Sequence, residues 1–421
     1  MTPEVKKRIE QIRQGIVPEG YKKTKTDIVP ADWKESPIGK YIREYTEKTT
    51  IPNQYPVLTS ARTGLMLQTD YYSNRQVTTE DNVGYNVLPY GYITFRSRSD
   101  DGRFRFNKNR IIERGVISYF YPVFSFSEEV CHEYMLYLLN FSIYRRMYPY
   151  AEGTAQQVLS LKKLGQLKYS LPLVAEQKKI AKILATQDKA IELQARKIEE
   201  LKRFKKGCLE KMFPRKGQKV PEKRFPGFTD DWEQRKLTEF VEFFSGLTYT
   251  PNDVQENGTL VLRSSNVSNG EVVDADNVYV NPQVVNSENV KVGDIVVVVR
   301  NGSRSLIGKH AQIKAFMPNT VIGAFMTGIR SECPKFTNAL LNTSRFEEEI
   351  AMNMGATINQ ITGYMFSKME FKVPCLDEQK EIGEYFENLD NLITLHQRKL
   401  EEMKKQKKAL MQLLLTGIER V

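Results

Sequence analysis

Two segments of the chain carry apolar residues at alternating steps of four and three positions, with charged residues between them. This heptad spacing is typical of long helices that bury one stripe of side chains. Pro172 and Pro374 stand where the helices are expected to begin, because proline is tolerated only near a helix start. Val174–Met212 would span roughly 58 Å at about 1.5 Å per residue. The stripes consist of Ile180, Leu184, Ile191, Ile198, Leu201, Cys208 and Met212 in the first segment, and of Ile382, Phe386, Leu389, Ile393, Leu400, Met403, Leu410 and Leu414 in the second.

The two helical segments are copies of each other. Sliding the chain by 202 positions over Pro172–Lys206 gives fifteen identities in thirty-five, and both copies begin with Pro-x-x-x-Glu-Gln-Lys. One stripe alone would also suit packing on a globular domain, but two matching stripes of equal length favour packing of the helices on each other, in either orientation. Polar residues interrupt the stripes and would fix the register of such a pair. They are Gln187, Gln194 and Lys205 in the first copy, and His396 and Lys407 in the second.

Ahead of each helix lies a block with the alternating pattern of strands, and the two tryptophans of the chain, Trp33 and Trp232, stand near the block starts. The sequence therefore predicts an α+β protein with a pseudo-two-fold internal repeat, in which two strand-rich globular domains are joined by two long helices. The expected parts are a first domain over residues 1–171, with a short N-terminal helix at Pro3–Gln14, a first helix over 172–213, a linker over 214–224, a second domain over 225–373 and a second helix over 374–417.

The clearest predicted strand pair is a hairpin over Tyr92–Phe106 with a four-residue turn. Period-two alternation places three phenylalanines (Phe95, Phe104 and Phe106) on one face and four arginines on the other. Like charges across a strand pair are destabilising unless an anion neutralises them, so we expect contact with DNA here rather than a plain solvated edge. The four arginines are Arg96, Arg98, Arg103 and Arg105, and Lys108, Arg110 and Arg114 extend the basic strip.

The second block repeats this plan, with a buried strand in Val292–Arg300 that leads into a polar loop. Each block closes on another polar loop, at Gly153–Val158 and Gly355–Ile361. Arginine and asparagine can read guanine and adenine edges, but the same residues also cap turns, so any one of them is more often structural. The further candidates for DNA contact are Arg62 and Gln157 in the first block and Arg263, Asn266, Arg300, Asn301, Arg304 and Gln360 in the second.

The net charge of +11 on the 421-residue chain is concentrated in one segment. Residues 160–224 hold 19 basic and 7 acidic groups, whereas residues 225–421 are net negative. This excess is compatible with a solvated helix face, with a phosphate contact that ignores the base sequence, or with a docking face for partner proteins.

Several classes of protein are disfavoured by motifs that are missing from the sequence. No apolar run approaches the roughly 20 residues needed to span a bilayer and no signal peptide is recognisable, so we expect a cytoplasmic protein with no membrane partner. Scattered cysteines and three isolated histidines predict no metal site. No phosphate-loop, dinucleotide-binding or amino-methyltransferase motif occurs. We therefore expect no catalytic residue, no cofactor and no enzyme activity of this chain by itself.

On these features the chain resembles the specificity (S) subunit of type I restriction–modification systems. The resemblance is carried by the two Pro-x-x-x-Glu-Gln-Lys helix starts, the two long helices and the segment Arg224–Trp232, which opens the second half as Arg-Phe-Pro-Gly-Phe-Thr-Asp-Asp-Trp. It covers essentially the whole chain. The first half departs from it, because Asp27–Trp33 has no Arg-Phe-Pro-Gly-Phe, and this leaves the role of residues 1–20 open.

The resemblance implies two target-recognition domains, each reading one half of a bipartite site in double-stranded DNA. The two long helices would pack as an antiparallel coiled coil that serves as a spacer. Two DNA methyltransferase (M) subunits would dock on this chain, and motor/nuclease (R) subunits would join them in a restriction complex for phage defence. S-adenosylmethionine, ATP and Mg²⁺ would serve those partners.

Two other functions stay open on the sequence. The Glu-Gln-Lys triplets are compatible with half of a nuclease motif, and the chain would then be a self-contained DNA-modifying or DNA-cleaving enzyme with a cryptic site. An acidic residue at a helix start is, however, also favoured by the helix dipole. A purely structural coiled-coil scaffold is the third possibility, and it would leave the strand-rich blocks without a role.

Overall fold

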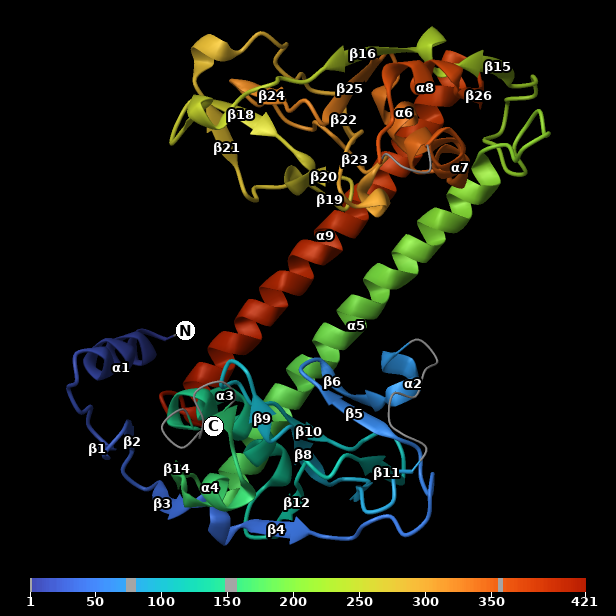
Figure 1. Ribbon diagram of the computed structural model, residues 1–421. Helices are drawn as coiled ribbons and strands as arrows, with labels where there is room; N and C mark the ends of the chain where they lie inside the picture. The colour runs from blue at the N-terminus through green and yellow to red at the C-terminus, as the bar shows by residue number, and fades with distance from the viewer. Residues whose placement is uncertain (1, 73–80, 148–156, 355–358) are drawn as a thin grey trace. The chain divides into compact units, whose positions relative to one another are not determined.

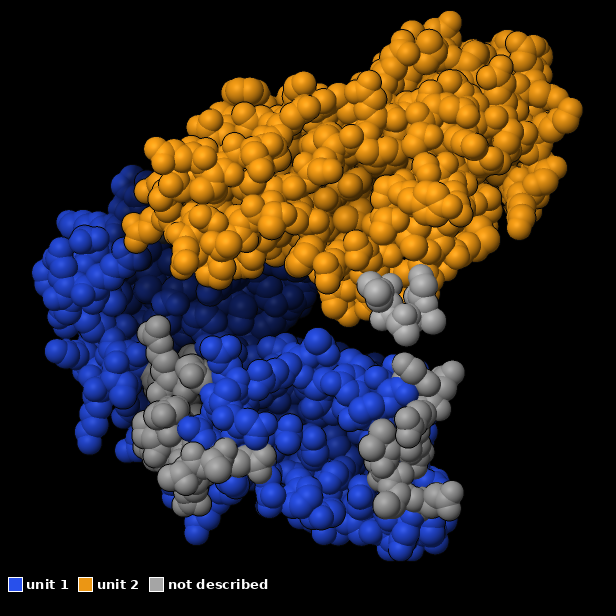
Figure 2. All heavy atoms as spheres, turned by 45° about the horizontal axis from the view of Figure 1, so that its top comes forward, with its two compact units in different colours: residues 1–193, 400–421 blue, residues 194–399 orange. Residues whose placement is uncertain are grey.

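The computed structural model describes residues 2–72, 81–147, 157–354 and 359–421. The chain forms two compact units, which Figure 2 colours separately: unit 1 comprises residues 1–193 and 400–421, and unit 2 comprises residues 194–399. The predicted α+β class with two strand-rich domains and two long helices is confirmed (Figure 1). The long helices are α5 (Val174–Met212) and α9 (Leu376–Leu415), and each unit contains part of both.

Unit 1 is built on a four-stranded antiparallel sheet in the order β10–β8–β12–β4. The sheet consists of β4 (Ile42–Tyr45), β8 (Ile93–Phe95), β10 (Phe106–Lys108) and β12 (Val123–Phe126). The other elements of this unit are α1 (Pro3–Arg13), β1 (Tyr21–Lys23), β2 (Ile28–Pro30), β3 (Lys34–Pro37), β5 (Leu58–Ala61), β6 (Gly64–Leu67), α2 (Gln68–Tyr71), β7 (Asn86–Pro89), β9 (Arg98–Ser99), β11 (Arg114–Ile117), α3 (His132–Met147), β13 (Gln157–Val158), α4 (Leu161–Gln166) and β14 (Lys168–Leu171).

Unit 2 contains the same sheet, in the order β23–β22–β25–β16. Its strands are β16 (Val241–Ser245), β22 (Ile295–Val298), β23 (His310–Gln312) and β25 (Met326–Ser331). The other elements are β15 (Glu233–Lys236), β17 (Val254–Gln255), β18 (Thr259–Leu262), β19 (Val267–Ser268), β20 (Glu271–Val272), β21 (Val278–Val280), η7 (Arg304–Leu306), β24 (Thr320–Ile322), α6 (Pro334–Leu341), α7 (Ser344–Asn353), α8 (Gly363–Lys368) and β26 (Glu370–Val373), with further short 3₁₀ turns between them.

The strand registers show that the repeat continues through both sheets. In unit 1 Thr94 pairs with Val123, and in unit 2 the equivalent Val296 pairs with Gly328. Gly91 and Gly293 precede the central strands with positive φ values of 85° and 96°, a conformation that favours glycine. The two domains therefore share one scaffold, although their polar residues differ.

Both cores are closed by the long helices. In unit 1 the start of α5 and the end of α9 pack into the core together, and in unit 2 the end of α5 and the start of α9 do the same. Burial of large aliphatic and aromatic side chains is the main stabilising term here. The helix residues involved are Ile180, Leu184, Leu414 and Leu415 in unit 1 and Leu209, Met212, Ile382 and Phe386 in unit 2.

The polar residues that interrupt the two stripes contact the opposite long helix. In unit 2, Lys205 binds Asp390 at 2.6 Å, and Gln194 lies 2.9 Å from the Nδ1 of His396, its own repeat equivalent. In unit 1 the reciprocal ion pair joins Lys407 to Asp188. Residues with higher numbers in α5 contact residues with lower numbers in α9, so the two helices run antiparallel within each unit. The continuous heptad seam itself stays a prediction.

The predicted hairpin over Tyr92–Phe106 forms only at its base. Phe95 pairs with Phe106, as the expected register requires, and the three phenylalanines are buried. Beyond this pair the strand leaves its neighbour, because β9 pairs with β13 instead and Leu159 N donates to the Ser97 carbonyl at 2.8 Å. The arrangement of Arg96, Arg98, Arg103 and Arg105 as cross-strand neighbours on one face is therefore wrong.

Candidate nucleic-acid interface

Each long helix begins with a buried glutamate that is held by an arginine. In unit 2, the Glu378 carboxylate accepts two hydrogen bonds from Arg224, at 2.8 and 2.7 Å. The Arg224 guanidinium comes from the Arg-Phe-Pro-Gly-Phe segment ahead of Trp232. Its pKa is raised chiefly by the hydrogen bond to Glu378. We call this contact the helix-start ion pair of unit 2.

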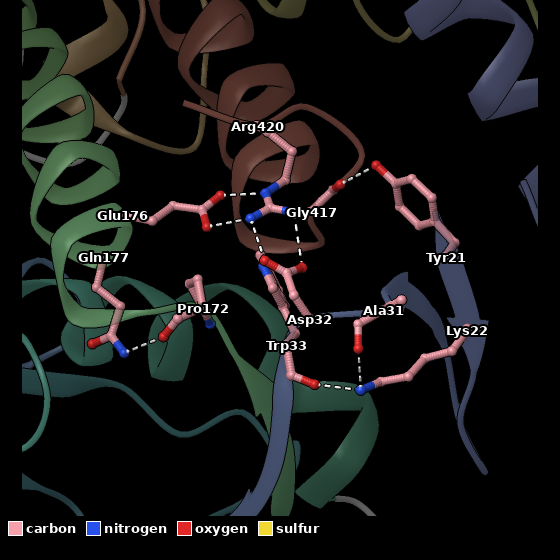
Figure 3. A network of polar contacts seen from close by, with 10 residues as sticks. All are labelled: Tyr21, Lys22, Ala31, Asp32, Trp33, Pro172, Glu176, Gln177, Gly417 and Arg420. Atoms are coloured by element: carbon pink, nitrogen blue, oxygen red, sulfur yellow. Dashed lines mark hydrogen bonds and ion pairs between the residues drawn. The ribbon is translucent and has the colours of Figure 1, made fainter. Parts of the chain in front are cut away.

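In unit 1 the same place is filled from the other end of the chain (Figure 3). Arg420 donates to Glu176 at 2.6 and 2.8 Å and also to Asp32 at 3.0 and 2.9 Å. The hydrogen bond from Arg420 is also the main reason why the pKa of Asp32 is lowered. This contact is the helix-start ion pair of unit 1, and the missing Arg-Phe-Pro-Gly-Phe segment is thereby replaced by the C-terminal tail.

The N-terminal segment holds that tail in position. The Tyr21 hydroxyl donates to the Gly417 carbonyl at 2.6 Å, and Arg8 donates to the Ile418 carbonyl at 2.5 Å. Gly417 has a φ of +71°, and a side chain there would meet Pro30 and Trp33. The predicted short helix at Pro3–Gln14 is observed as α1, and residues 1–20 therefore have a structural role in capturing the chain end.

The glutamines of the repeated Glu-Gln-Lys triplets are structural as well. Gln177 and Gln379 are buried, and each donates from Nε2 to the carbonyl of the proline five residues earlier, at 2.9 Å in both copies. With the carboxylate bound to arginine and the amide bound to backbone, the glutamate and glutamine of each triplet are both engaged in fixing a helix start. The nuclease interpretation of these residues is therefore disfavoured.

A second repeated feature lies where the central strand of each sheet ends. In unit 1, the Arg98 guanidinium carbon lies 4.6 Å from the ring centre of Phe120, and in unit 2, that of Arg300 lies 5.1 Å from the ring centre of Phe325. Next to each arginine runs the polar loop that closes the domain, because Arg98 is paired with Val158 and Arg300 with Gln360. The strand-end cluster is Arg98, Phe120 and Val158 in unit 1, and Arg300, Phe325 and Gln360 in unit 2, and Gln157 pairs with Ser99 beside the first cluster.

Other contacts show that the two clusters are equivalent. The Leu159 amide donates to the Ser97 carbonyl in unit 1, and the Ile361 amide donates to the Val299 carbonyl in unit 2, both at 2.8 Å. The two donors are 202 positions apart in the chain, and so are the two acceptors. Residues Gly153–Gln156 and Gly355–Ile358 of the predicted closing loops lie outside the described residues. In each unit, the described end of the closing loop nevertheless pairs with the segment that follows the central strand.

The remaining candidates fall into groups. Four basic residues are bound by carboxylates of their own domain: Arg62 by Asp101, Lys108 and Arg110 by Glu133, and Arg263 by Asp276. Arg114, in the extended strip, likewise binds Glu47. Among the described residues no carboxylate partner is found for Arg98 or Arg300. Arg62 and Arg110 are nevertheless exposed, and the other candidate arginines on exposed positions are Arg96, Arg98, Arg103, Arg105, Arg300 and Arg304.

The polar candidates differ in how much of the side chain is available. Asn266, a candidate for DNA contact, is only 1% exposed, so its side chain is not accessible in this structure. Its Oδ1 accepts from Arg263 N at 2.9 Å, and its Nδ2 donates to the Ala275 carbonyl at 2.8 Å. Asn301 is half-buried and donates to Ser264 Oγ at 3.1 Å. Gln157 and Gln360 are half-buried beside the strand ends.

Three of the described side chains that build these sites were not anticipated from the sequence. Phe120 and Phe325 looked like ordinary apolar residues, and Arg420 stood in a short tail with no motif. Phe120 and Phe325 are 205 positions apart, and this offset identifies them as equivalent residues only once the strand registers are known.

The described residues contain no group of three or more His, Cys, Asp or Glu side chains that could hold a metal ion. Within the same residues, no helix has the length and apolarity needed to cross a membrane.

Comparison with known proteins returns one family. The model described as "Type I restriction modification DNA specificity domain" matches residues 22–203 and 229–405. The curated MjaVIII specificity subunit of a type I restriction enzyme from Methanocaldococcus jannaschii is 26% identical, over 97% of this chain and 98% of its own length. The EcoKI specificity subunit of Escherichia coli is also 26% identical, over 38% of this chain and 36% of its own.

Solved structures show the same fold. A crystal structure of the type I restriction-modification S subunit from M. genitalium covers 95% of this chain and 99% of its own, at 16% identity and a TM-score of 0.56. A chain from a structural study of assembly and conformational transition of the type I R-M system covers 93% and 99%, at 15% identity and a TM-score of 0.55.

Proposed function

The chain belongs to the type I restriction modification DNA specificity family, and we propose on this basis that it is the non-catalytic subunit that gives a type I restriction–modification complex its DNA sequence specificity. Each strand-rich domain reads one half of a bipartite site. The observation that carries the proposal is the strand-end cluster. It occurs once in each unit, at the same place on the two equivalent sheets, and the polar residues around it differ between the units.

The candidate side chains differ in whether their hydrogen-bond donors are already used within the protein, and this decides their proposed role in DNA binding. Arg98 and Arg300 end the two central strands without a carboxylate partner among the described residues, so both keep donors for base edges or phosphates. Gln157 and Gln360 stand beside them. The other exposed arginines supply phosphate contacts, which fix position without reading sequence. Arg62, Lys108, Arg110, Arg263 and Asn301 have partners within the protein and act in DNA binding only if those contacts are exchanged.

The basic segment 160–224 has a separate role. Apart from Lys205, which binds Asp390, its lysines on α5 occupy exposed positions, for example Lys178, Lys182 and Lys197. A row of this kind suits phosphates without regard to sequence, or the docking of partner subunits. A helix of 39 residues spans roughly 58 Å, which exceeds a DNA turn of about 34 Å, so helices of this length suit a spacer between half-sites.

We assign the chemistry of the complex to its partners. Two methyltransferase subunits dock on this chain, motor/nuclease subunits join them, and the chain itself needs no cofactor. It works in the cytoplasm, where the host DNA lies. A hidden enzymatic site is not supported by any described cluster of catalytic groups.

The test begins with the complex of this chain and its methyltransferase. Mapping the adenines methylated by the complex gives both half-sites and the spacing between them. The complex should then bind a duplex with both half-sites much more tightly than one in which either half-site is scrambled. Equal binding of intact and scrambled sites would overturn the proposed function.

The same assay examines the arginines at the strand end of unit 1. Replacing Arg96 and Arg98 together with alanine should weaken binding, and each lost phosphate contact should reduce the salt dependence by about one unit of slope. The matched control is Arg43→Ala in the same unit, because the exposed Arg43 guanidinium donates to the neighbouring carbonyls of Lys40 and Ile42. An unchanged affinity of the double variant would remove this strand end from the interface.

A further inference from the structure

Both strand-end clusters present a phenylalanine to solvent. Phe120 is 39% exposed and Phe325 is 57% exposed, although burial of such a ring would normally be favourable. Their positions are equivalent: each lies four residues after a valine in parallel pairing, Val116 with Val57 in unit 1 and Val321 with Val261 in unit 2. A large exposed apolar side chain at the same place in both copies therefore needs an explanation.

The backbone of each phenylalanine is fixed by the end of the central strand. In unit 2, the Phe325 carbonyl accepts from the amides of Val299 and Arg300, at 3.0 and 3.2 Å. In unit 1, the Phe120 carbonyl accepts from Ser97 Oγ at 2.5 Å. Ser97 and Val299 are repeat equivalents. Each ring is thus held at a defined position, and its exposure is not the result of a loose chain end.

The ring in turn orients the arginine. A guanidinium that lies over an aromatic face uses its flat surface for this contact, while its N–H groups point outward in the plane of the group. These donors stay available for an acceptor that approaches the edge. Each cluster therefore presents an apolar ring and a preorganised fork of donors side by side.

The residues around this shared pair differ between the units. Tyr119 stacks on Phe120 with ring centres 4.1 Å apart, whereas the equivalent residue in unit 2 is Ala324. The loop residues that pair beside the arginines are Val158 and Gln360. A constant element surrounded by variable neighbours suits two readers that approach DNA in the same way but select different bases.

We propose that Phe120 and Phe325 are base-contacting residues, each of which places its ring against the apolar surface of a base in its half-site and holds Arg98 or Arg300 against the same site. The inference rests on the proposed function and names the residues that carry specificity. In duplex DNA the apolar surfaces within reach are the thymine methyl group in the major groove and a base step opened by an inserted side chain, and phenylalanine contacts both. A phosphate contact would not need the ring.

The experiment uses the complex with its methyltransferase and three duplexes, with both half-sites intact, with the first scrambled and with the second scrambled. Phe120→Ala and Phe325→Ala should each lower affinity for the intact site about tenfold, or about 1.4 kcal/mol. Scrambling one half-site should then matter less in Phe120→Ala, and scrambling the other should matter less in Phe325→Ala. The salt slope should stay unchanged, because no phosphate contact is lost.

Matched controls are Tyr90→Ala in unit 1 and Phe316→Ala in unit 2, since these aromatics are 61% and 79% exposed but lie outside the clusters. Both controls should bind as the wild type does. Phe120→Leu and Phe325→Leu retain apolar bulk and should lose less affinity than the alanine variants. Thermal unfolding and co-purification with the methyltransferase should be unchanged in all variants.

Three results would overturn the inference: wild-type affinity of both alanine variants, equal losses on intact and scrambled duplexes, or loss of methyltransferase binding, which would make the rings a docking surface. Failure of the proposed function looks different. In that case the wild-type complex itself would not distinguish the three duplexes.

Discussion

The two helix-start ion pairs have the same geometry but use arginines from different parts of the chain. Arg224 precedes the domain whose helix start it binds, whereas Arg420 follows the last helix and binds a helix start 244 positions earlier in the sequence. In both units, the arginine follows the end of one long helix and binds the start of the other. Each structural repeat therefore contains the end of one long helix, an arginine after it, a strand-rich domain and the start of the other long helix. In unit 1 the arginine comes from the C-terminal tail.

The two pairs also differ in their access to water. The side chains of Arg224 and Glu378 are 14% and 1% exposed, whereas Arg420 is 39% exposed and is shared between Glu176 and Asp32. Removing one partner of a buried pair leaves an uncompensated charge, while water can solvate the survivors of a more open pair. The comparison thus predicts unequal effects of equivalent substitutions.

The largest effect is expected from Arg224→Ala. It should lower the free energy of unfolding of unit 2 by about 3–5 kcal/mol, because Glu378 would stay buried without a partner. Arg420→Ala should lower that of unit 1 by about 1–2 kcal/mol, because Arg420 is 39% and Asp32 is 56% exposed, although Glu176 itself is buried. Trp33 lies in unit 1 and Trp232 in unit 2, so single-tryptophan backgrounds made with Trp232→Phe or Trp33→Phe report the two units separately in denaturant titrations.

Arg235→Ala is the matched control for the first substitution. Its contact with Glu239 is 3.8 Å long and both side chains are well exposed, so the change should be below about 0.5 kcal/mol. Equal losses from Arg224→Ala and Arg420→Ala would show that burial does not distinguish the two ion pairs.

Much of this architecture could be predicted from the sequence, because the helices repeat openly. Heptad spacing and the fifteen identities are local signals, and the predicted positions of both long helices agree with α5 and α9. Of the polar interruptions, Gln194 contacts His396, and Lys205 binds Asp390 on the opposite helix. The role of Arg420 could not be found in this way, because its partner Asp32 lies 388 residues away and no motif marks the tail.

The candidate site was predicted less well, for a different physical reason. Alternation correctly buried Phe95 and Phe106, but it could not show that β13 competes for the end of the same strand and ends the hairpin. Asn266 has the chemistry of an adenine reader, yet its hydrogen bonds are all made within the fold. Residue type suggests what a side chain can bind, whereas tertiary contacts decide whether its donors are still available.

The reciprocal ion pairs between the long helices should respond to charge reversal. Lys205→Asp places like charges beside Asp390 and should lower the free energy of unfolding of unit 2 by about 2 kcal/mol. Adding Asp390→Lys restores opposite charges and should recover most of this loss. The reciprocal pair of Lys407 and Asp188 in unit 1 is more exposed, at 23% and 42%, so Lys407→Asp should cost less.

Chemical unfolding followed by Trp232 fluorescence measures the stability of the Lys205 and Asp390 variants in unit 2. Trp33 fluorescence measures that of the Lys407 variant in unit 1. Lys202→Asp is the control on the same helix, since the partner of Lys202 in the described structure is the exposed Glu199. If the double reversal in unit 2 did not recover stability, the ion pair would not be a determinant of helix pairing.

The smallest expected effect concerns a histidine that the repeat does not share. His310 on β23 pairs with Val297, and the equivalent position in unit 1 is occupied by Phe106, which pairs with Phe95. His310 lies 3.0 Å from the Gly308 carbonyl through Nδ1 and 3.2 Å from the Asn342 amide nitrogen through Nε2. These contacts require a neutral ring that donates from Nδ1 and accepts at Nε2.

Burial is the main reason why the pKa of His310 lies below its usual value of 6.5, and it outweighs the opposing hydrogen bond to Gly308. The unfolded chain therefore binds a proton more readily than unit 2 does, so the free energy of unfolding should fall as the pH drops through 6.5. The slope cannot exceed about 1.4 kcal/mol per pH unit for one group, which sets the upper limit of the stability loss from this histidine below pH 6.5. His310→Phe, which introduces the residue found in unit 1, should remove this part of the pH dependence from the Trp232 signal. The Trp33 signal of unit 1 should be unaffected, and an unchanged slope in His310→Phe would assign the acid sensitivity of unit 2 to its carboxylates.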